Sequence, residues 1–168
     1  MQFIQKIKGC NTAILDTRKT TPGLRALEKY AVRCGGGQNH RFNLKEMILI
    51  KDNHKAVLSD EGLLIKKIRL AQSLQKPITI ETDNLIEFKK ILKLKPDIIL
   101  LDNMPINQIR KAVKIVKSIK GKGPLLEASG GINLMNVKKF AQTGVDRISI
   151  GALTHTHQAI NLSLEMIS

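Results

Sequence analysis

The stretch ITIETDNLIEFKKILKLKPDIILLDN, residues 78–103, decides the fold. It starts with the run Ile78–Ile80 and ends with a second run, Asp97–Leu101, each rich in isoleucine and leucine. Between them, Asn84 precedes LIEFKKILKL, and Glu87 stands where the glutamate of a helix capping box belongs. Runs that are apolar at nearly every position indicate strands buried on both faces. The stretch therefore predicts a strand, a helix and a second, parallel strand.

The same alternation continues in both directions. The predicted strands are Thr12–Leu15, Met47–Ile50, Ile78–Ile80, Asp97–Leu101, Leu125–Ala128 and Arg147–Ile150. Predicted helices follow the cap residues Thr21 (with Pro22 in first position), Ser59, Asn84, Pro105 and Asn133, and Gly121 and Gly144 end the last two. Such alternation is typical of an α/β fold with a parallel sheet and crossover helices. About six units without a GxGxxG or GxxxxGK[ST] motif favour a TIM-like (β/α) barrel, incomplete or open, over a dinucleotide-binding sheet.

Length and composition limit the classes of protein that remain. The chain has 168 residues, which predicts a single domain over residues 1–168. It has no apolar run of membrane-spanning length and no signal-peptide pattern, and its cysteines, Cys10 and Cys34, make neither a disulfide framework nor a CxxC site. We therefore expect a cytoplasmic protein with no membrane partner.

The chain is strongly basic, with 28 Lys and Arg against 14 Asp and Glu, a net charge of +14. Nucleic-acid binding is one interpretation of such a charge. However, the lysines alternate with apolar residues, as on solvated helix faces, and only 3% of the residues are aromatic, too few for base stacking. We therefore treat nucleic-acid binding as an alternative, beside a site for small polyanions.

Polar side chains follow every predicted strand. In strand order they are 16–20, 51–54, 81 and 83, 102 and 103, 129–131, and 151, 154 and 155. In a (β/α) barrel these strand ends open on one face, where the chemistry takes place. We expect the active site at this mouth.

The residue types at the mouth indicate an anionic substrate. The expected cations are Arg18, Lys19, Arg41 and Lys51. Arginine binds carboxylate and phosphate through two parallel hydrogen bonds, and lysine acts as a point charge. Glu81 and Asp102 offer hard oxygen ligands for Mg²⁺ or for ribose hydroxyls. Ser129–Gly131 precedes the helix predicted after Asn133, a setting that favours phosphate. These features predict a phosphorylated substrate that binds together with Mg²⁺.

Five motifs carry a resemblance to a known family. They are DTRKTTPGLRALEKYAVRCGGGQNHR (16–41), LIKDNH (49–54), LLDNM (100–104), LEASGGI (126–132) and GVDRISIGALTH (144–155). In this order they resemble quinolinate phosphoribosyltransferase, or carboxylating nicotinate-nucleotide pyrophosphorylase, along the whole chain. The resemblance implies a glycosyltransferase reaction in NAD biosynthesis. Quinolinate takes phosphoribosyl from phosphoribosyl pyrophosphate and loses CO₂, giving nicotinate mononucleotide and pyrophosphate.

The resemblance also implies roles for individual residues. Substrate would be bound by Thr17, Arg18, Lys19, His40, Arg41, Lys51, Glu81 and Asp102, with Lys51, Glu81 and Asp102 catalytic. Phosphate would be bound by Ser129, Gly130, Gly131, Ile150, Gly151 and Ala152. Glu81 and Asp102 would hold the Mg²⁺ that accompanies the pyrophosphate, and no tightly bound organic cofactor is expected. An alternative role for His40 is to brace a loop.

The chain also departs from the family pattern. Its first residues, MQFIQKIKGC, resemble the helix that leads into the barrel, so the family's N-terminal domain and its arginine are expected to be absent. We accordingly expect weak or no activity from this chain alone. The family implies a homodimer or larger assembly, and here a separate N-terminal domain as a partner. Thr79 stands where the family usually carries an acidic residue. The alternatives are a related phosphoribosyltransferase, or a non-catalytic remnant or half of a split enzyme that binds anions without turnover.

Overall fold

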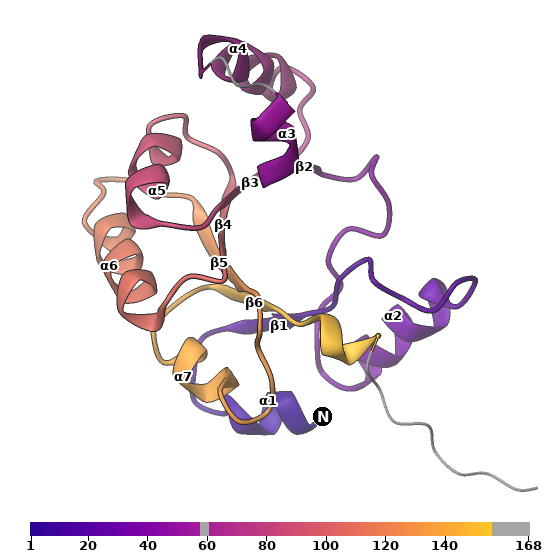
Figure 1. Cartoon of the computed structure of the whole chain (residues 1–168). Helices are drawn as coiled ribbons and strands as arrows, with labels where there is room; N and C mark the ends of the chain where they lie inside the picture. Colours follow the sequence, from indigo (N-terminus) through magenta and orange to yellow (C-terminus); the bar gives the residue numbers. More distant parts are fainter. Residues whose placement is uncertain (58–60, 156–168) are drawn as a thin grey trace, which may run out of the picture.

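Six parallel strands form one sheet that curves into an open barrel (Figure 1). The computed structural model describes residues 1–57 and 61–155. The strands are β1 (Ala13–Leu15), β2 (Ile48–Ile50), β3 (Ile78–Thr82), β4 (Ile98–Asp102), β5 (Leu125–Ser129) and β6 (Arg147–Ser149). Their order is β1-β6-β5-β4-β3-β2, so β1 and β2 are the outermost strands of the described sheet, and β1 makes one further parallel bridge, from Leu15 to Gln38. The predicted fold class, an incomplete TIM-like barrel, is confirmed.

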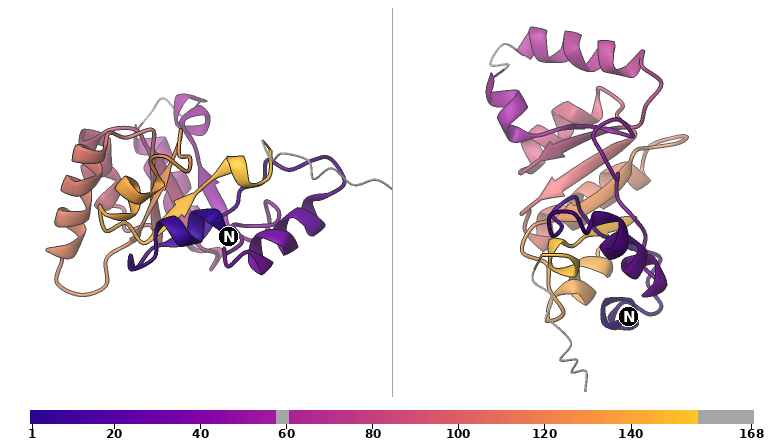
Figure 2. Two further views of the ribbon diagram at one scale, coloured as in Figure 1. Left: turned by 90° about the horizontal axis from the view of Figure 1, so that it is seen from below. Right: turned by 90° about the vertical axis from the view of Figure 1, so that its right-hand side faces the viewer.

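Helices cover the outside of the curved sheet. They are α1 (Gln2–Lys6), α2 (Arg25–Cys34), α3 (Asp52–Val57), α4 (Glu61–Gln72), α5 (Leu85–Leu92), α6 (Ile106–Lys117), α7 (Val137–Ala141) and the 3₁₀ turn η1 (Gly151–Leu153). Figure 1 shows α5, α6 and α7 along the outer side of the strands, with α1 beside α7. The right-hand view of Figure 2 shows α4 beyond the β2 edge of the sheet. No described helix is long and apolar enough to cross a membrane.

The parallel register divides the strand side chains between two environments. One face packs against the helices, and Ile80, Ile99 and Ile148 are fully buried there in the same core as Phe88 and Ile109. Each such side chain contributes roughly 1.5–3 kcal/mol when it is removed from water. The opposite face turns into the barrel. The register aligns Glu81, Leu100, Glu127 and Arg147 across β3–β6, so that charged groups lie within the barrel.

Several predicted helix boundaries are wrong. The helix expected from Pro22 begins at Arg25, because residues 21–24 form a turn in which Gly23 adopts a φ of +79°. The helix expected after Asn133 begins at Val137, because the Asn133 carboxamide accepts the N–H of Met135 in a local turn.

At the other helix ends, the predicted cap residue agrees with the structure at α5, and the predicted stop residue does not agree at α6. Asn84 caps α5 as predicted, accepting the N–H of Glu87 at 2.8 Å. Helix α6 ends at Lys117, before the expected stop at Gly121. Asp52–Val57, for which the sequence predicts no helix, form the short helix α3. The predicted cap Ser59 lies outside the described residues.

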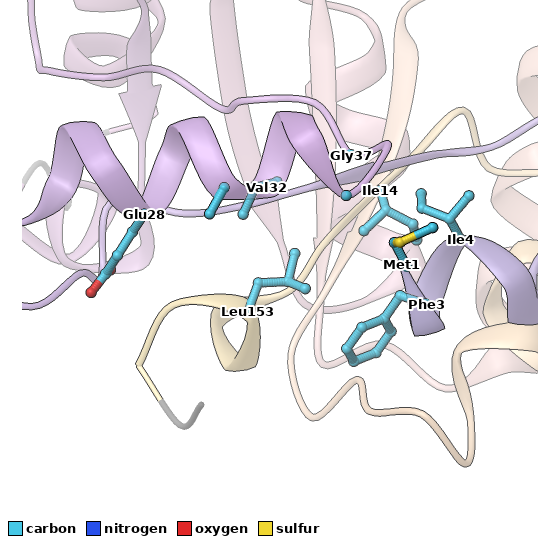
Figure 3. A pocket seen from close by; sticks show the side chains of 10 residues that line it. Met1, Phe3, Ile4, Ile14, Glu28, Val32, Gly37 and Leu153 are labelled. Atoms are coloured by element: carbon cyan, nitrogen blue, oxygen red, sulfur yellow. The ribbon is translucent and has the colours of Figure 1, made fainter. Parts of the chain in front are cut away.

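An apolar hollow of about 320 Å³ lies away from the barrel mouth. Figure 3 shows Met1, Ile4 of α1, Ile14 of β1, Val32 of α2 and Leu153 of η1 around it. This hollow contains none of the cations or carboxylates predicted to bind substrate. It therefore belongs to the packing between α1 and α2.

Candidate functional site

A cavity of about 760 Å³ lies at the C-terminal ends of the strands. Every residue predicted above to bind substrate, phosphate or Mg²⁺ lines it: Thr17, Arg18, Lys19, His40, Arg41, Lys51, Glu81, Asp102, Ser129, Gly130, Gly131, Ile150, Gly151 and Ala152. These residues come from all six strand ends and from the loop that follows α2. The fold therefore brings together side chains that are far apart in the sequence, and their individual roles stay predictions.

The sheet order separates the lining residues by chemistry. Cations follow the two edge strands, with Arg18 after β1 and Lys51 after β2. Carboxylates lie at the ends of the adjacent strands β3 and β4, and the glycine turns follow the adjacent strands β5 and β6. The cavity thus has a cationic side, an acidic side and a side formed by backbone turns.

The acidic side holds two carboxylates and one nearby ammonium group. Lys51 Nζ lies 3.7 Å from Glu81 Oε2. Burial raises the pKa of Glu81, and the negative charges of Asp102 and Asp52 raise it further, against the lowering effect of Lys51. Lys51 therefore neutralises only part of the negative charge on the acidic side. The remaining negative charge suits the binding of a cation or of hydroxyl donors.

The donor set at Glu81 and Asp102 fits Mg²⁺ that enters with its substrate. Among the described residues no group of three or more His, Cys, Asp or Glu side chains could hold a metal. Mg²⁺ typically binds one or two carboxylates and takes its remaining oxygens from water and substrate phosphates. Two carboxylates beside the glycine turns, where phosphate is predicted to bind, meet that requirement.

Hydrogen bonds from arginine side chains to backbone carbonyls hold the cationic side in place. The Arg41 guanidinium donates to the carbonyl of Met47 at 2.8 Å, and Arg25 donates to the carbonyl of Arg18 at 3.1 Å. Burial lowers the pKa of Arg41, and the positive charge of Arg18 lowers it further. The Arg18 Nε atom is buried and makes no hydrogen bond within the described protein. Two repelling guanidiniums with a free donor form a site that an anion would stabilise.

The turn after β5 allows another group to approach its backbone closely. Gly130 and Gly131 have φ values of +92° and +59°, which favour glycine. The N–H of Asn103 donates to the Ser129 carbonyl at 2.9 Å, and the Asn103 carboxamide donates to Asp102 at 2.8 Å. The turn at the end of β5 is thereby tied to the acidic end of β4.

The expected helix end behind this turn is absent. Helix α7 starts only at Val137 and has five residues, so the prediction of a helix that begins after Asn133, close behind Ser129–Gly131, is wrong. Any phosphate at Ser129–Gly131 would therefore depend on loop N–H groups rather than on a helix dipole. On the neighbouring strand, the Ile150 N–H donates to the Leu15 carbonyl at 2.9 Å, and the His155 ring packs over Gly151.

A buried ion pair anchors the loop that carries Arg41. Lys29 of α2 and Asp16 at the end of β1 are both buried and in direct contact. Asp16 also accepts the backbone N–H of His40 at 2.8 Å, and Lys29 donates to the His40 carbonyl at 2.9 Å. Sequence reasoning missed this pair, because lysine is among the residues that are almost never fully buried unless paired.

Glu127 is the functional candidate to which the sequence assigned no role. It lines the cavity, is fully buried, and its oxygens lie 3.2 Å from His40 Nε2 and 3.4 Å from Arg147 Nε. Burial acts to raise the pKa of Glu127, but contact with His40 and the charge of Arg147 outweigh it, so that the pKa is lowered. The available signal was a glutamate inside the otherwise apolar strand sequence LLEA.

Thr79 lies on the same strand face as Glu81 but outside the cavity lining. It is fully buried, and its hydroxyl contacts the Met47 sulfur at 3.1 Å. The residue at this position therefore fills the barrel below the cavity.

Comparisons with known proteins agree with the geometry. The family model described as "Quinolinate phosphoribosyl transferase, C-terminal domain" matches residues 1–165. The carboxylating nicotinate-nucleotide pyrophosphorylase of Mycobacterium leprae is 42% identical over 164 residues, covering 98% of this chain and 57% of that protein. A probable nicotinate-nucleotide pyrophosphorylase of Methanocaldococcus jannaschii is 39% identical over 171 residues, covering 99% of this chain and 60% of that protein.

Solved structures give the same result. The nicotinate-nucleotide pyrophosphorylase of Ehrlichia chaffeensis superimposes with a TM-score of 0.83 at 46% identity, covering 92% of this chain and 55% of that one. The enzyme of Francisella tularensis gives 0.84 at 40% identity, covering 96% and 55%. The chain thus spans somewhat more than half the length of these relatives. It belongs to the quinolinate phosphoribosyltransferase family, and its residues correspond to the C-terminal domain of that family.

Proposed function

We propose that this chain provides the barrel on which quinolinate reacts with phosphoribosyl pyrophosphate to give nicotinate mononucleotide, CO₂ and pyrophosphate. One observation carries the proposal. A single cavity combines a cationic side, an acidic side and a side of glycine turns, and these match a dicarboxylate, a ribose with its metal, and a phosphate.

Quinolinate is assigned to the cationic side. Its two adjacent carboxylates match the guanidiniums of Arg18 and Arg41, with Lys19 and Lys51 as further positive charges. Guanidinium groups bind carboxylates through paired hydrogen bonds, which also orient the pyridine ring. The buried and unpartnered Nε of Arg18 supplies a donor for this purpose.

Phosphoribosyl pyrophosphate is assigned to the other two sides. Its 5′-phosphate would accept N–H groups from the turns at Ser129–Gly131 and Ile150–Ala152, while its ribose hydroxyls would face Glu81 and Asp102. Glu81 and Asp102 would also hold the Mg²⁺ of this substrate, which when bound supplies positive charge to the pyrophosphate leaving group.

The chain's own groups then assist both bond changes. The quinolinate ring nitrogen forms a bond to the anomeric carbon of the ribose, and the bond from that carbon to pyrophosphate breaks with its electron pair leaving on oxygen. Positive charge builds up on the ribose in this step, and the Glu81 and Asp102 carboxylates stabilise it. The ring carboxylate next to the nitrogen then leaves as CO₂, and a proton takes its place on the ring carbon. Lys51 is the cation proposed to stabilise the electron pair left on that carbon.

The chain would act in the cytoplasm, which agrees with its free Cys10 and Cys34 thiols. It would act in a homodimer or larger assembly, or with a separate N-terminal domain as partner. Such a partner would cover the mouth of the cavity and exclude water from the reacting groups.

The direct test is calorimetric titration of the purified chain, first with quinolinate and then with phosphoribosyl pyrophosphate and Mg²⁺, followed by an assay for nicotinate mononucleotide. We expect both ligands to bind and little or no product to form from the chain alone. Nicotinate, which has one carboxylate, is the matched control ligand and should bind more weakly than quinolinate.

Each other outcome has a defined meaning. Product formation at rates typical of full-length relatives would refute the expected weak activity and show that the barrel is sufficient. Failure of a folded sample to bind either ligand would refute the proposed function and favour a non-catalytic remnant. Tight binding to arbitrary DNA that weakens steeply with salt would favour the nucleic-acid alternative.

A further inference from the structure

His40 is fixed by protein contacts at its backbone and at both ring nitrogens. Its backbone N–H donates to Asp16 and its carbonyl accepts from Lys29. Its ring Nδ1 accepts the backbone N–H of Arg41 at 2.8 Å, and its ring Nε2 lies 3.2 Å from Glu127 Oε1. Although the ring borders the cavity, Nδ1 accepts from Arg41, and Nε2 faces Glu127, both of whose carboxylate oxygens are buried without a hydrogen bond in the described protein.

These contacts define which nitrogen carries the proton. A nitrogen that accepts an N–H cannot carry a proton itself, so Nδ1 is unprotonated when it accepts from Arg41. The proton of the neutral ring is then on Nε2, which faces Glu127. An ionised carboxylate can only accept hydrogen bonds, so Glu127 requires a proton on the nitrogen that faces it. The two contacts favour the same tautomer.

The charged groups around His40 support an ionised Glu127. Asp16 and Lys29 neutralise one another on the backbone side of His40. On the ring side, Arg147 of β6 lies 3.4 Å from the second oxygen of Glu127. Arg41, the remaining cation in contact with His40, extends its guanidinium to the Met47 carbonyl. Glu127 is thus a buried carboxylate between an imidazole and a guanidinium.

We infer that Glu127 is a positioning residue, which acts through the Nε2–H tautomer of His40 to hold the backbone of Arg41 at the cavity wall. Only one consequence of this inference rests on the proposed function, namely that the Arg41 guanidinium is placed correctly for quinolinate. In this arrangement His40 braces the loop and does not bind the substrate directly.

The first test measures the tautomer without any ligand. Long-range ¹H–¹⁵N spectra of the folded chain distinguish protonated from unprotonated ring nitrogens, and the chain has 4 histidines, so His40→Asn identifies the His40 signals. We expect an unprotonated Nδ1 and a protonated Nε2, together with slow hydrogen exchange at the Arg41 amide. A protonated Nδ1 at neutral pH would overturn the inference.

The second test changes Glu127 with little change in shape. In Glu127→Gln the carboxamide can donate as well as accept, so it no longer selects one tautomer. We expect the Nδ1–H tautomer to appear, the Arg41 amide to exchange faster, and the dissociation constant for quinolinate to rise roughly tenfold, as when other orienting partners are removed. Glu87→Gln is the control, because Glu87 also pairs with a lysine but does not line the cavity.

A double-mutant cycle tests whether Glu127 acts through His40. His40→Asn should weaken quinolinate binding, and adding Glu127→Gln should then weaken it little further. Additive losses would overturn the inference, as would a changed tautomer with unchanged affinity and Arg41 exchange. If the wild-type chain does not bind quinolinate, the proposed function fails, but the tautomer and the Arg41 exchange still decide the inference.

Discussion

Gly130 packs directly against Asn103, and this contact joins the glycine turn after β5 to the acidic side of the cavity. A Cβ atom added at Gly130 would fall on the Asn103 side chain and lie 2.9 Å from its backbone nitrogen. Because Asn103 donates to Asp102, the close approach also fixes the Asp102 carboxylate. Gly130 is therefore constrained by both its φ of +92° and the space beside it.

Gly130→Ala should therefore displace Asn103 and Asp102 as well as strain the turn. We expect a loss of roughly 1–3 kcal/mol in the free energy of unfolding and at least a tenfold weaker affinity for phosphoribosyl pyrophosphate with Mg²⁺. Gly121→Ala is the matched control, because Gly121 has a φ of +96° with open space beside it. Urea unfolding and calorimetry measure the two effects. Equal losses in the two variants would contradict the steric explanation.

Removing a cation from the cationic side should weaken dicarboxylate binding. We expect Arg41→Met and Arg18→Met each to raise the dissociation constant for quinolinate by a factor of ten or more, since a charge-assisted hydrogen bond contributes about 1.5–3 kcal/mol. Arg110→Met, on the exposed surface of α6, is the control for lost net charge. Calorimetry at fixed salt checks the result, and a similar loss in Arg110→Met would indicate only a general charge effect.

The buried pair between Asp16 and Lys29 should matter more for stability than a partly exposed pair. Lys29→Met leaves the Asp16 carboxylate buried without its cation, and we expect a loss of about 3–5 kcal/mol in the free energy of unfolding. Lys55→Met removes the pair between Lys55 and Glu87, whose side chains are 16% and 24% exposed, and should cost less. The Asn39 carboxamide also donates to Asp16, at 2.6 Å. Comparable losses in denaturant unfolding would show that this bond and the His40 N–H support the Asp16 carboxylate adequately.

The lowered pKa of Glu127 predicts a pH dependence of stability. The ionised form is favoured in the folded state, so Glu127 stabilises the fold fully above the ordinary glutamate pKa of about 4.3. This contribution is lost as the pH falls through the lower, folded-state value. The difference in unfolding free energy between wild type and Glu127→Gln should therefore shrink from pH 6 towards about pH 3. A difference that stays constant would contradict an ionised Glu127.

Removal of Mg²⁺ should act through Glu81 and Asp102. We expect a chelator to weaken phosphoribosyl pyrophosphate binding to the wild-type chain while leaving quinolinate binding unchanged. Glu81→Gln and Asp102→Asn should reduce this dependence on Mg²⁺, because they remove the carboxylates proposed to hold the metal. Unchanged Mg²⁺ dependence in both variants would remove these residues from the metal site.

The strands were predictable to within two residues because their signal is local. Runs such as Ile98–Leu101 are apolar on both faces, and this pattern distinguishes buried parallel strands from surface elements. The helix starts were less predictable. Thr21 and Asn133 are both good cap residues, but the same side chains also stabilise turns, and the structure uses turns at both places.

Most members of the candidate site were predictable because they stand next to a strand end, whereas His40, on the loop after α2, was predicted only through the family resemblance. The contacts between the members were not predictable. The burial of Lys29 depends on Asp16, 13 residues away, and the contact between His40 and Glu127 joins a loop to a strand across the barrel. Neither neighbour is close in sequence, so no local pattern indicates that such charged groups are buried in pairs.

The sequence by itself determined the alternation of strands and helices, the open (β/α) barrel and the set of polar residues at its mouth, because each follows from short-range hydrophobic periodicity and from the rule that parallel strands end on one face. Only the tertiary structure decided which of these residues line one cavity and which contact one another. The pairing of Glu127 with His40 and of Gly130 with Asn103 is set by sheet register and loop packing, and these are fixed by contacts between distant segments.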